Sequence, residues 1–287
     1  MLALLRILSR IPLSVLYALS TVLYLILRYL YPYRRAVIEK NIQIAFPKYT
    51  RKQVDALRFA FYRWFAEFTV ETLKLYTAPL TQIRAMMSVE LPPSLVQHSK
   101  DGQSVITLLG HYGQWEYFNA SGPFAHLFSA RPVYSPLKNK VADDFAIAIR
   151  TRSGAEVLKR SDTAREIIKM LRNKTLFSLG LLADQSATAR QATKARFFGV
   201  ETSFFSGPGK LAEKFNMPVY FVRMQRVKRG QYKSSLELLV DKDSGRTGQE
   251  IVQLFATVLE EQIKETPYLW LWSHNRWKRD IPAVTSA

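Results

Sequence analysis

His111 and Glu116 are the residues of this chain best suited to acid–base chemistry. They stand in the stretch GHYGQWEYF at residues 110–118, and His111 is one of only four histidines. A carboxylate that binds one imidazole nitrogen fixes the tautomer and leaves the other nitrogen free to take a proton from a hydroxyl. We therefore interpret His111 as a base and Glu116 as its orienting acid, although structural ion pairs give the same pattern.

The backbone has to turn at His111 for this pairing to form. On a regular helix, side chains five residues apart are rotated by roughly 140°, so they do not face each other. The apolar run 104–109 predicts a strand, and Gly110 and Gly113 permit a turn directly after it. Open α/β sheets usually hold their chemistry at the carboxyl ends of strands, which is where His111 is expected to lie.

The rest of the chain predicts the elements that position this turn. Apolar strand patterns alternate with helical ones, which indicates an α/β fold with a mixed, largely parallel central sheet flanked by helices. The predicted strands are 104–109, 175–182, 217–224 and 234–240, and the predicted helices lie near 114–120, 139–152, 161–172, 207–215 and 247–264. No internal repeat or long linker interrupts the sequence, so residues 36–287 are expected to form one catalytic domain.

Residues 1–35 are expected to attach the protein to a membrane. Residues 11–27 carry no charge, which is near the lower limit for a spanning helix, and Arg28, Arg34 and Arg35 follow. A transmembrane or membrane-anchoring helix is the first interpretation; a buried core helix, an interfacial helix and a cleaved signal peptide are the alternatives. A second helix is predicted to begin at Thr50, because Thr50 and Gln53 have capping-box spacing.

The charge distribution favours a polyanionic partner and a cytoplasmic catalytic domain. The formal net charge is +18, and all but two of the 41 Lys and Arg residues follow the apolar run. Together with the 23 acidic residues they leave +16 on that part of the chain. Basic flanks beside an anchor face the cytoplasm and suit an anionic lipid surface, which argues against nucleic acid as the partner.

Several kinds of chemistry lack their usual signatures. The chain has no cysteine, which excludes thiolate metal sites, disulfides and cysteine nucleophiles. It also has no Gly-x-Ser-x-Gly motif, and residues 207–210 lack the spacing of a phosphate loop. His98, His126 and His274 have no metal-ligand spacing. We therefore expect neither a metal nor a cofactor.

Several motifs in the chain resemble those of one enzyme family. His111 to Glu116 is similar to the His-x4-acid motif of glycerolipid and lipid A acyltransferases, and the Glu resembles the lipid A late acyltransferase (lauroyl/myristoyl transferase) branch. The further similar blocks are residues 33–35 through Asn41 and 46–47, 150–154, 184–185 with 197–199, and 268–272 with 276–278. They occur in the family's order along most of the chain. Unlike a generic phospholipid acyltransferase, the chain has no clear Glu-Gly-Thr-Arg block after residues 176–182.

The resemblance implies a membrane-bound O-acyltransferase of lipid A, hence lipopolysaccharide, biosynthesis at the bacterial inner membrane, with its catalytic domain on the cytoplasmic side. The acyl donor would be acyl carrier protein or acyl-CoA, and the acceptor a phosphorylated glycolipid. Transfer would be direct, without an acyl-enzyme. The site residues implied besides His111 and Glu116 are Arg150 or Arg152 for the oxyanion, and Asp184, Gln185, Trp115, Arg276 and Lys278 for substrates. An apolar pocket near Trp115, Tyr117 and Phe118 is expected to hold the acyl chain.

Two other functions remain open from the sequence. A related acyltransferase for another glycolipid or an amino-acid lipid would share every motif. A non-catalytic basic membrane-binding protein would use His111 and Glu116 only as a structural pair.

Overall fold

The core of the protein is a mixed, mostly parallel sheet, as the alternating pattern predicts. In the computed structural model, which describes residues 1–280, seven strands lie in the order β1-β9-β8-β2-β5-β3-β4, and β8 with β9 is the antiparallel pair. The strand bounds are β1 Met87–Glu90, β2 Val105–Leu109, β3 Ser129–Tyr134, β4 Leu158–Lys159, β5 Phe177–Leu182, β8 Val219–Lys228 and β9 Gln231–Val240. Every residue of β2 is buried, which fits a central strand that is covered on both faces.

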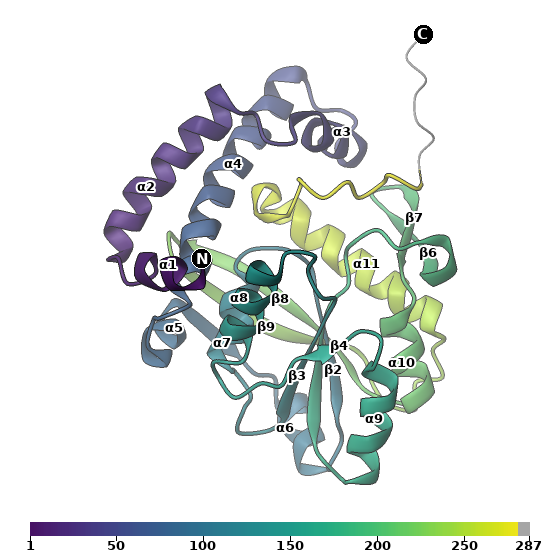
Figure 1. Ribbon diagram of the computed structural model, residues 1–287. Coiled ribbons are helices and arrows are strands. Elements are labelled where there is room, and N and C mark those ends of the chain that lie inside the picture. The colour runs from purple at the N-terminus through teal and green to yellow at the C-terminus, as the bar shows by residue number, and fades with distance from the viewer. Residues whose placement is uncertain (281–287) are drawn as a thin grey trace.

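Helices surround this sheet, and the N-terminal helices form a layer of their own at one end of it (Figure 1). The α-helices are α1 Leu2–Leu8, α2 Leu13–Leu25, α3 Arg35–Ala45, α4 Arg51–Lys74, α5 Leu80–Met86, α6 Pro93–Lys100, α7 Trp115–Ser121, α8 Lys140–Arg150, α9 Thr163–Arg172, α10 Gly207–Phe215 and α11 Gly248–Glu265. A π-helical turn, Ile26–Leu30, continues α2, and 3-10 turns occupy Ala189–Gln191 and Pro267–Leu269. The predicted capping box at Thr50 and Gln53 is confirmed at the start of α4.

Helix α2 lies along α4 in the opposite direction. Ser9 Oγ and Thr77 Oγ1 are 2.9 Å apart, the Tyr17 hydroxyl donates to Glu71 at 2.9 Å, and the Arg28 guanidinium lies 4.2 Å from the Phe59 ring centroid. Residues Leu13–Leu30 form a helical stretch long and apolar enough to cross a membrane, but only 22% of that stretch is buried. The candidate membrane-anchoring helix is therefore docked on the domain along one side and exposed on the other.

The predicted strands and helices around the sheet are confirmed to within a few residues, whereas a β-hairpin was not predicted. Strands β6 Ala192–Phe197 and β7 Val200–Phe205 pair antiparallel, with Phe197 opposite Val200. Phe198 and Gly199 form the two-residue turn, and their φ values are +52° and +76°. Two positive φ values suit the twist of a hairpin, but Phe-Gly lacks the Asn-Gly or Asp-Gly sequence that usually signals such a turn.

The register of the sheet sets the position of the site. Strands β2 and β5 are parallel neighbours, and Leu109 lies opposite Leu182. His111 and Asp184 each follow two residues after these partners, so both lie at the same carboxyl edge of the sheet. The register of β2 against β5 thus brings the imidazole of His111 and the carboxylate of Asp184 together.

Candidate active site

The turn that carries His111 is held by the C-terminal segment. The Gly113 amide donates to the Leu269 carbonyl at 2.9 Å, and the His111 carbonyl accepts from the Leu271 amide at 3.0 Å. Gly113 has a φ of +59°, which a side chain would strain. A Cβ on Gly110 would lie 2.5 Å from Leu259 Cδ1, so this position also favours glycine. The predicted break in the backbone at His111 is confirmed.

Asp184 is the carboxylate that binds the His111 side chain. Its Oδ1 lies 2.6 Å from His111 Nδ1, and its Oδ2 accepts from the His111 amide at 3.0 Å and from the Trp270 indole at 2.8 Å. Asp184 is only 3% exposed. Burial by itself raises the pKa of the Asp184 carboxyl, but the His111 ring and amide and the Trp270 indole outweigh it and hold that pKa well below its usual range. An ionised Asp184 therefore accepts a hydrogen bond from Nδ1 and leaves Nε2 as the free nitrogen.

The open nitrogen of His111 faces a polar side chain. Gln185 Nε2 lies 3.4 Å from His111 Nε2. The Trp115 ring meets the imidazole edge to face, with 5.1 Å between ring centroids. His111 keeps 15% of its side chain exposed.

Glu116 does not orient His111 in this structure, and this expected pairing needs correction. The Glu116 carboxylate forms an ion pair with Arg150 at the end of α8, with Arg150 Nε 3.0 Å from Oε2, and accepts from the Trp115 indole at 3.1 Å. Glu116 lies in the first turn of the buried helix α7, where the facing helix α8 supplies a full cation. Asp184 has already taken Nδ1 of His111. The Trp115 side chain connects the two pairs, because it contacts both His111 and Glu116.

The two arginines predicted for the oxyanion have different partners. Arg150 lies beside Glu116, whereas Arg152 donates to the backbone carbonyls of Tyr76 and Ala78. The sequence left open which of them acts near His111. Arg150 is connected to the His111 turn by a series of contacts. It pairs with Glu116, which accepts from the Trp115 indole, and the Trp115 ring contacts His111.

The remaining predicted substrate-binding residues lie in unlike surroundings. Arg276 is 0% exposed, donates to the Ser203 carbonyl at 2.8 Å and stacks 4.1 Å from the Phe204 centroid. Burial lowers its pKa to about 10. Such a side chain does not reach a substrate phosphate, so that role of Arg276 is corrected to a structural one, whereas Lys278 is exposed. Trp115, Tyr117 and Phe118, expected beside the acyl chain, are all buried.

His274 supports the loop that carries Asp184, a role that was not predicted from the sequence. Its Nε2 accepts from the Ser186 amide at 3.1 Å, and its carbonyl accepts from Asn41 at 2.7 Å. Burial lowers the pKa of His274 to about 4. The native state therefore holds this imidazole neutral.

We expect protonation of His274 to destabilise the protein in mild acid. Its pKa of about 4 in the folded protein lies below the ordinary histidine value of 6.5, so the unfolded state binds the proton first. The stabilisation is complete above pH 6.5 and falls by up to about 3 kcal/mol as pH decreases to about 4. Denaturant unfolding of the His274→Gln variant should show less of this decrease, whereas His126→Gln, which alters an exposed histidine, should keep it. Equal pH profiles for the two variants would contradict this role.

The arrangement of His111 and Asp184 defines a class of protein. An imidazole fixed by a buried carboxylate at the carboxyl edge of a mostly parallel sheet is typical of α/β enzymes that use histidine as a general base. No group of three or more His, Asp or Glu side chains that could hold a metal occurs within residues 1–280.

The chain belongs to the bacterial lipid A biosynthesis acyltransferase family. The model of that family matches residues 1–279, which confirms the resemblance seen in the motifs. Comparison with individual curated proteins gives no match. Membership indicates acyltransferase activity in lipid A biosynthesis, with an acyl donor and a lipid A-type acceptor, in a family that is associated with membranes.

Proposed function

We propose that this protein transfers a fatty acyl chain from a thioester to a hydroxyl of a phosphorylated lipid A precursor, with His111 as the general base. The observation that carries the proposal is the 2.6 Å contact between His111 Nδ1 and Asp184, which leaves Nε2 open beside Gln185. A base must lie within hydrogen-bond reach of the proton that it takes, and the exposed part of His111 permits this.

In the proposed reaction, Nε2 of His111 takes the proton of the acceptor hydroxyl while its oxygen attacks the thioester carbonyl. The new C–O bond forms, the C–S bond breaks, and the proton passes from the imidazolium to the departing thiolate. Asp184 stabilises the imidazolium and keeps its orientation throughout. No acyl-enzyme is required, since the acceptor oxygen is the nucleophile.

The oxyanion of this reaction needs donors near Nε2. Gln185 presents its amide group 3.4 Å from that nitrogen. Arg150, at the end of α8, places a positive charge beside Glu116 of α7. We assign Gln185 and Arg150 to oxyanion stabilisation, where one donor is worth about 3 kcal/mol. Arg152, which donates to the backbone carbonyls of Tyr76 and Ala78, is not assigned to this role.

A row of aromatic side chains supports the path of the acyl chains. Starting at Tyr33, ring centroids follow at 5.8 Å to Phe65, 6.4 Å to Phe68 and 4.2 Å to Trp115, which contacts His111. Tyr33, Phe65 and Phe68 are only partly buried. We propose that an acyl chain lies along this row, which ends at Trp115.

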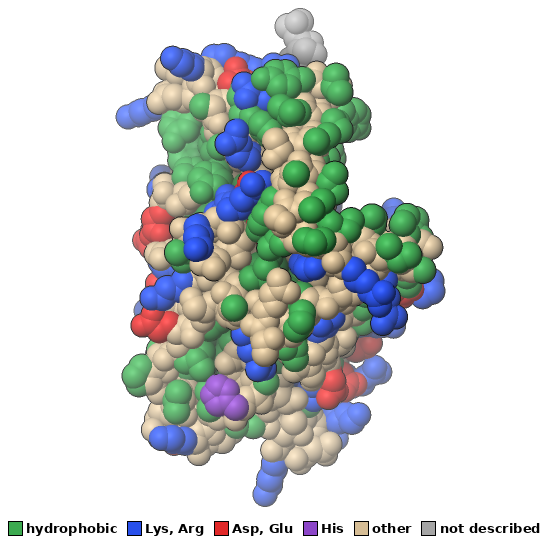
Figure 2. Space-filling model, turned by 90° about the vertical axis from the view of Figure 1, so that its left-hand side faces the viewer, with side chains coloured by type: hydrophobic (Ala, Val, Ile, Leu, Met, Phe, Trp, Pro, Cys, Tyr) green, Lys and Arg blue, Asp and Glu red, His purple; other side chains and the backbone are tan. Residues whose placement is uncertain are grey.

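Residues 1–35 are proposed to bind the membrane in its plane. Within residues 1–280, 16 large hydrophobic side chains are exposed, and 11 of them lie in residues 1–31: Met1, Leu4, Ile7, Val15, Leu19, Val22, Leu25, Ile26, Tyr29, Leu30 and Tyr31. Figure 2 shows the side of the molecule with these helices, where hydrophobic side chains gather with Lys and Arg around them. Such a surface fits one leaflet of an anionic bilayer.

The docking of α2 on α4 favours this in-plane attachment over a helix that crosses the bilayer. Helix α4 follows α2 along its length and carries Arg58, Arg63, Glu67 and Glu71. A crossing α2 would take these charges into the hydrocarbon, which is costly. Burial also raises the pKa of the Glu71 carboxyl, which accepts from Tyr17 of α2 and from Gln114 in the catalytic loop.

We expect Leu19→Glu with Val22→Glu to release the protein from vesicles that contain phosphatidylglycerol. Both side chains are about half exposed, so the folded domain has no need of them. Flotation measures the bound fraction, and Leu137→Glu, an exposed leucine outside this surface, serves as the control. Retention of both variants on vesicles to the same extent would contradict the in-plane surface.

The donor and the acceptor are tested directly with purified enzyme in mixed micelles. Acyl carrier protein and CoA thioesters are compared as donors, and a phosphorylated lipid A precursor is compared with other glycolipid and amino-acid lipid acceptors. The net charge of +18 favours acidic partners on both sides and a position at the cytoplasmic face of the inner membrane. Transfer to another acceptor alone would favour the related-acyltransferase alternative, and no transfer to any acceptor would favour a non-catalytic membrane-binding protein.

A further inference from the structure

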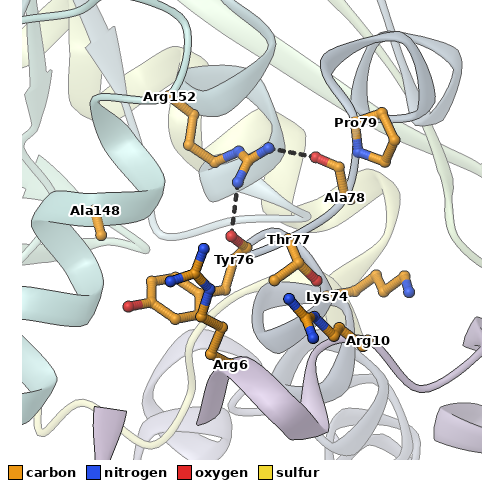
Figure 3. Close-up of a pocket in the computed structure, with 9 residues that line it drawn as sticks. All are labelled: Arg6, Arg10, Lys74, Tyr76, Thr77, Ala78, Pro79, Ala148 and Arg152. Atoms are coloured by element: carbon orange, nitrogen blue, oxygen red, sulfur yellow. Dashed lines mark hydrogen bonds between the residues drawn. The ribbon is translucent and has the colours of Figure 1, made fainter. Parts of the chain in front are cut away.

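A cationic site lies apart from the His111 turn, at the junction of α1 with the end of α4. It surrounds a cavity of about 620 Å³, which is shown in Figure 3. Arg6 of α1 and Arg10 of the turn after α1 approach the cavity from one side, and Arg152 reaches it from the opposite side (Figure 3). The lining residues are Arg6, Arg10, Lys74, Tyr76, Thr77, Ala78, Pro79, Ala148 and Arg152. Four of these nine side chains are cationic and none is acidic.

The four cations have no carboxylate partner within residues 1–280. Lys74 donates to the Ile11 carbonyl at 3.0 Å, and Arg152 donates to the Tyr76 carbonyl at 2.6 Å and to that of Ala78. The Nε–H of Arg152 is buried and has no hydrogen-bond partner. Neither Arg6 nor Arg10 forms a salt bridge within the same part of the chain. Like charges that share one cavity repel each other, so an anion bound among them would be stabilised.

The cavity adjoins the membrane-binding surface. Leu4 and Ile7, which are 55% and 63% exposed, belong to the same short helix as Arg6. Ala148, on the other side of the cavity, belongs to α8, the helix that ends at Arg150. A ligand in this cavity would therefore lie near the polar boundary of the lipid.

The geometry points to a site for a phosphate monoester of the membrane-bound acceptor. Arg6 and Arg10 can present paired N–H donors that match phosphate oxygens. Lys74 and Arg152, which donate to backbone carbonyls, add positive charge that suits a dianion. The expected acceptor is an amphiphile with its chains in the leaflet and its phosphate at the surface. This inference rests on the proposed function, because it assigns the cavity to the acceptor of that reaction.

The test compares acceptors with and without the phosphate. In the Arg6→Gln/Arg10→Gln double variant, both changed side chains are exposed, so the fold is expected to remain intact. We expect at least a tenfold increase in KM for the phosphorylated acceptor, with no change in KM for the dephosphorylated acceptor or for the thioester donor. The control variant is Arg172→Gln/Arg246→Gln, which removes the same charge from exposed arginines outside the cavity and outside residues 1–35, and should leave all three KM values unchanged.

A binding measurement separates this site from the proposed reaction. Titration calorimetry with dihexanoyl phosphatidic acid should show saturable binding that the Arg6→Gln/Arg10→Gln variant loses and the control keeps, whether or not acyl transfer occurs. An equal increase in KM for both acceptors would overturn the assignment, as would an increase for the donor alone. So would weaker binding to phosphatidylglycerol vesicles with unchanged KM values, because it would assign the cavity to bulk lipid headgroups.

Discussion

Replacement of His111 by Ala should abolish acyl transfer, and Asp184→Asn should lower kcat by a factor of about 10² to 10⁴ with little change in KM. In the native site the Asp184 carboxylate accepts from Nδ1 of His111 at 2.6 Å. An asparagine amide can donate to Nδ1 instead, which places the proton on Nε2 and removes the base. Rates are measured with purified enzyme in mixed micelles.

A second histidine–carboxylate pair in the protein provides the matched control. His98 lies between Tyr220 near the start of β8 and Asp241 just after β9. The Tyr220 hydroxyl is 2.7 Å from Nδ1, and the Asp241 carboxylate is 3.0 Å from Nε2. Asp241→Asn makes the same chemical change beside a histidine that has no proposed role in the reaction. Near-normal transfer by His111→Ala, or equal rates for Asp184→Asn and Asp241→Asn, would remove His111 and Asp184 from the mechanism.

The Glu116–Arg150 ion pair predicts the largest effect on stability. Glu116→Gln or Arg150→Met alone leaves one buried charge without its partner, which usually costs about 3–5 kcal/mol. The double variant removes both charges, so it should be more stable than the sum of the single changes predicts. Free energies of unfolding in urea and mild detergent measure this coupling.

The exposed pair Lys140–Asp144 is the control for this cycle. Its nitrogen and oxygen lie 2.9 Å apart on the surface of α8, and we expect no measurable coupling between its two single variants. Additive effects of Glu116→Gln and Arg150→Met would contradict the ion pair. Coupling of Glu116→Gln to His111→Ala instead would restore the pairing expected from the sequence.

The sheet and the position of His111 followed from the sequence because they depend on local patterns. The apolar run before Gly110 and the strand pattern before Asp184 placed two polar residues at strand ends. Their pairing was not foreseen, since it depends on β2 and β5 being neighbours in register, and local patterns do not specify strand order. A strand-end Asp close to a strand-end His was the available signal.

The wrong expectations concern residues whose surroundings come from distant segments. Glu116 is near His111 along the chain, but α8 supplies Arg150 as its partner. Arg276 belongs to a basic stretch that reads as a surface segment, yet it packs between Ser203 and Phe204 of a hairpin that was not predicted. In both cases the decisive contact joins segments that are more than 30 residues apart.

The measurement that tests the central claim most directly is the mass of lipid A from cells that contain the gene and from cells that lack it. We predict that lipid A loses the mass of one fatty acyl group without the gene, and that the wild-type chain restores it whereas a stably expressed His111→Ala variant does not. Unchanged lipid A in the cells without the gene, or restoration by His111→Ala, would contradict acyl transfer by this histidine.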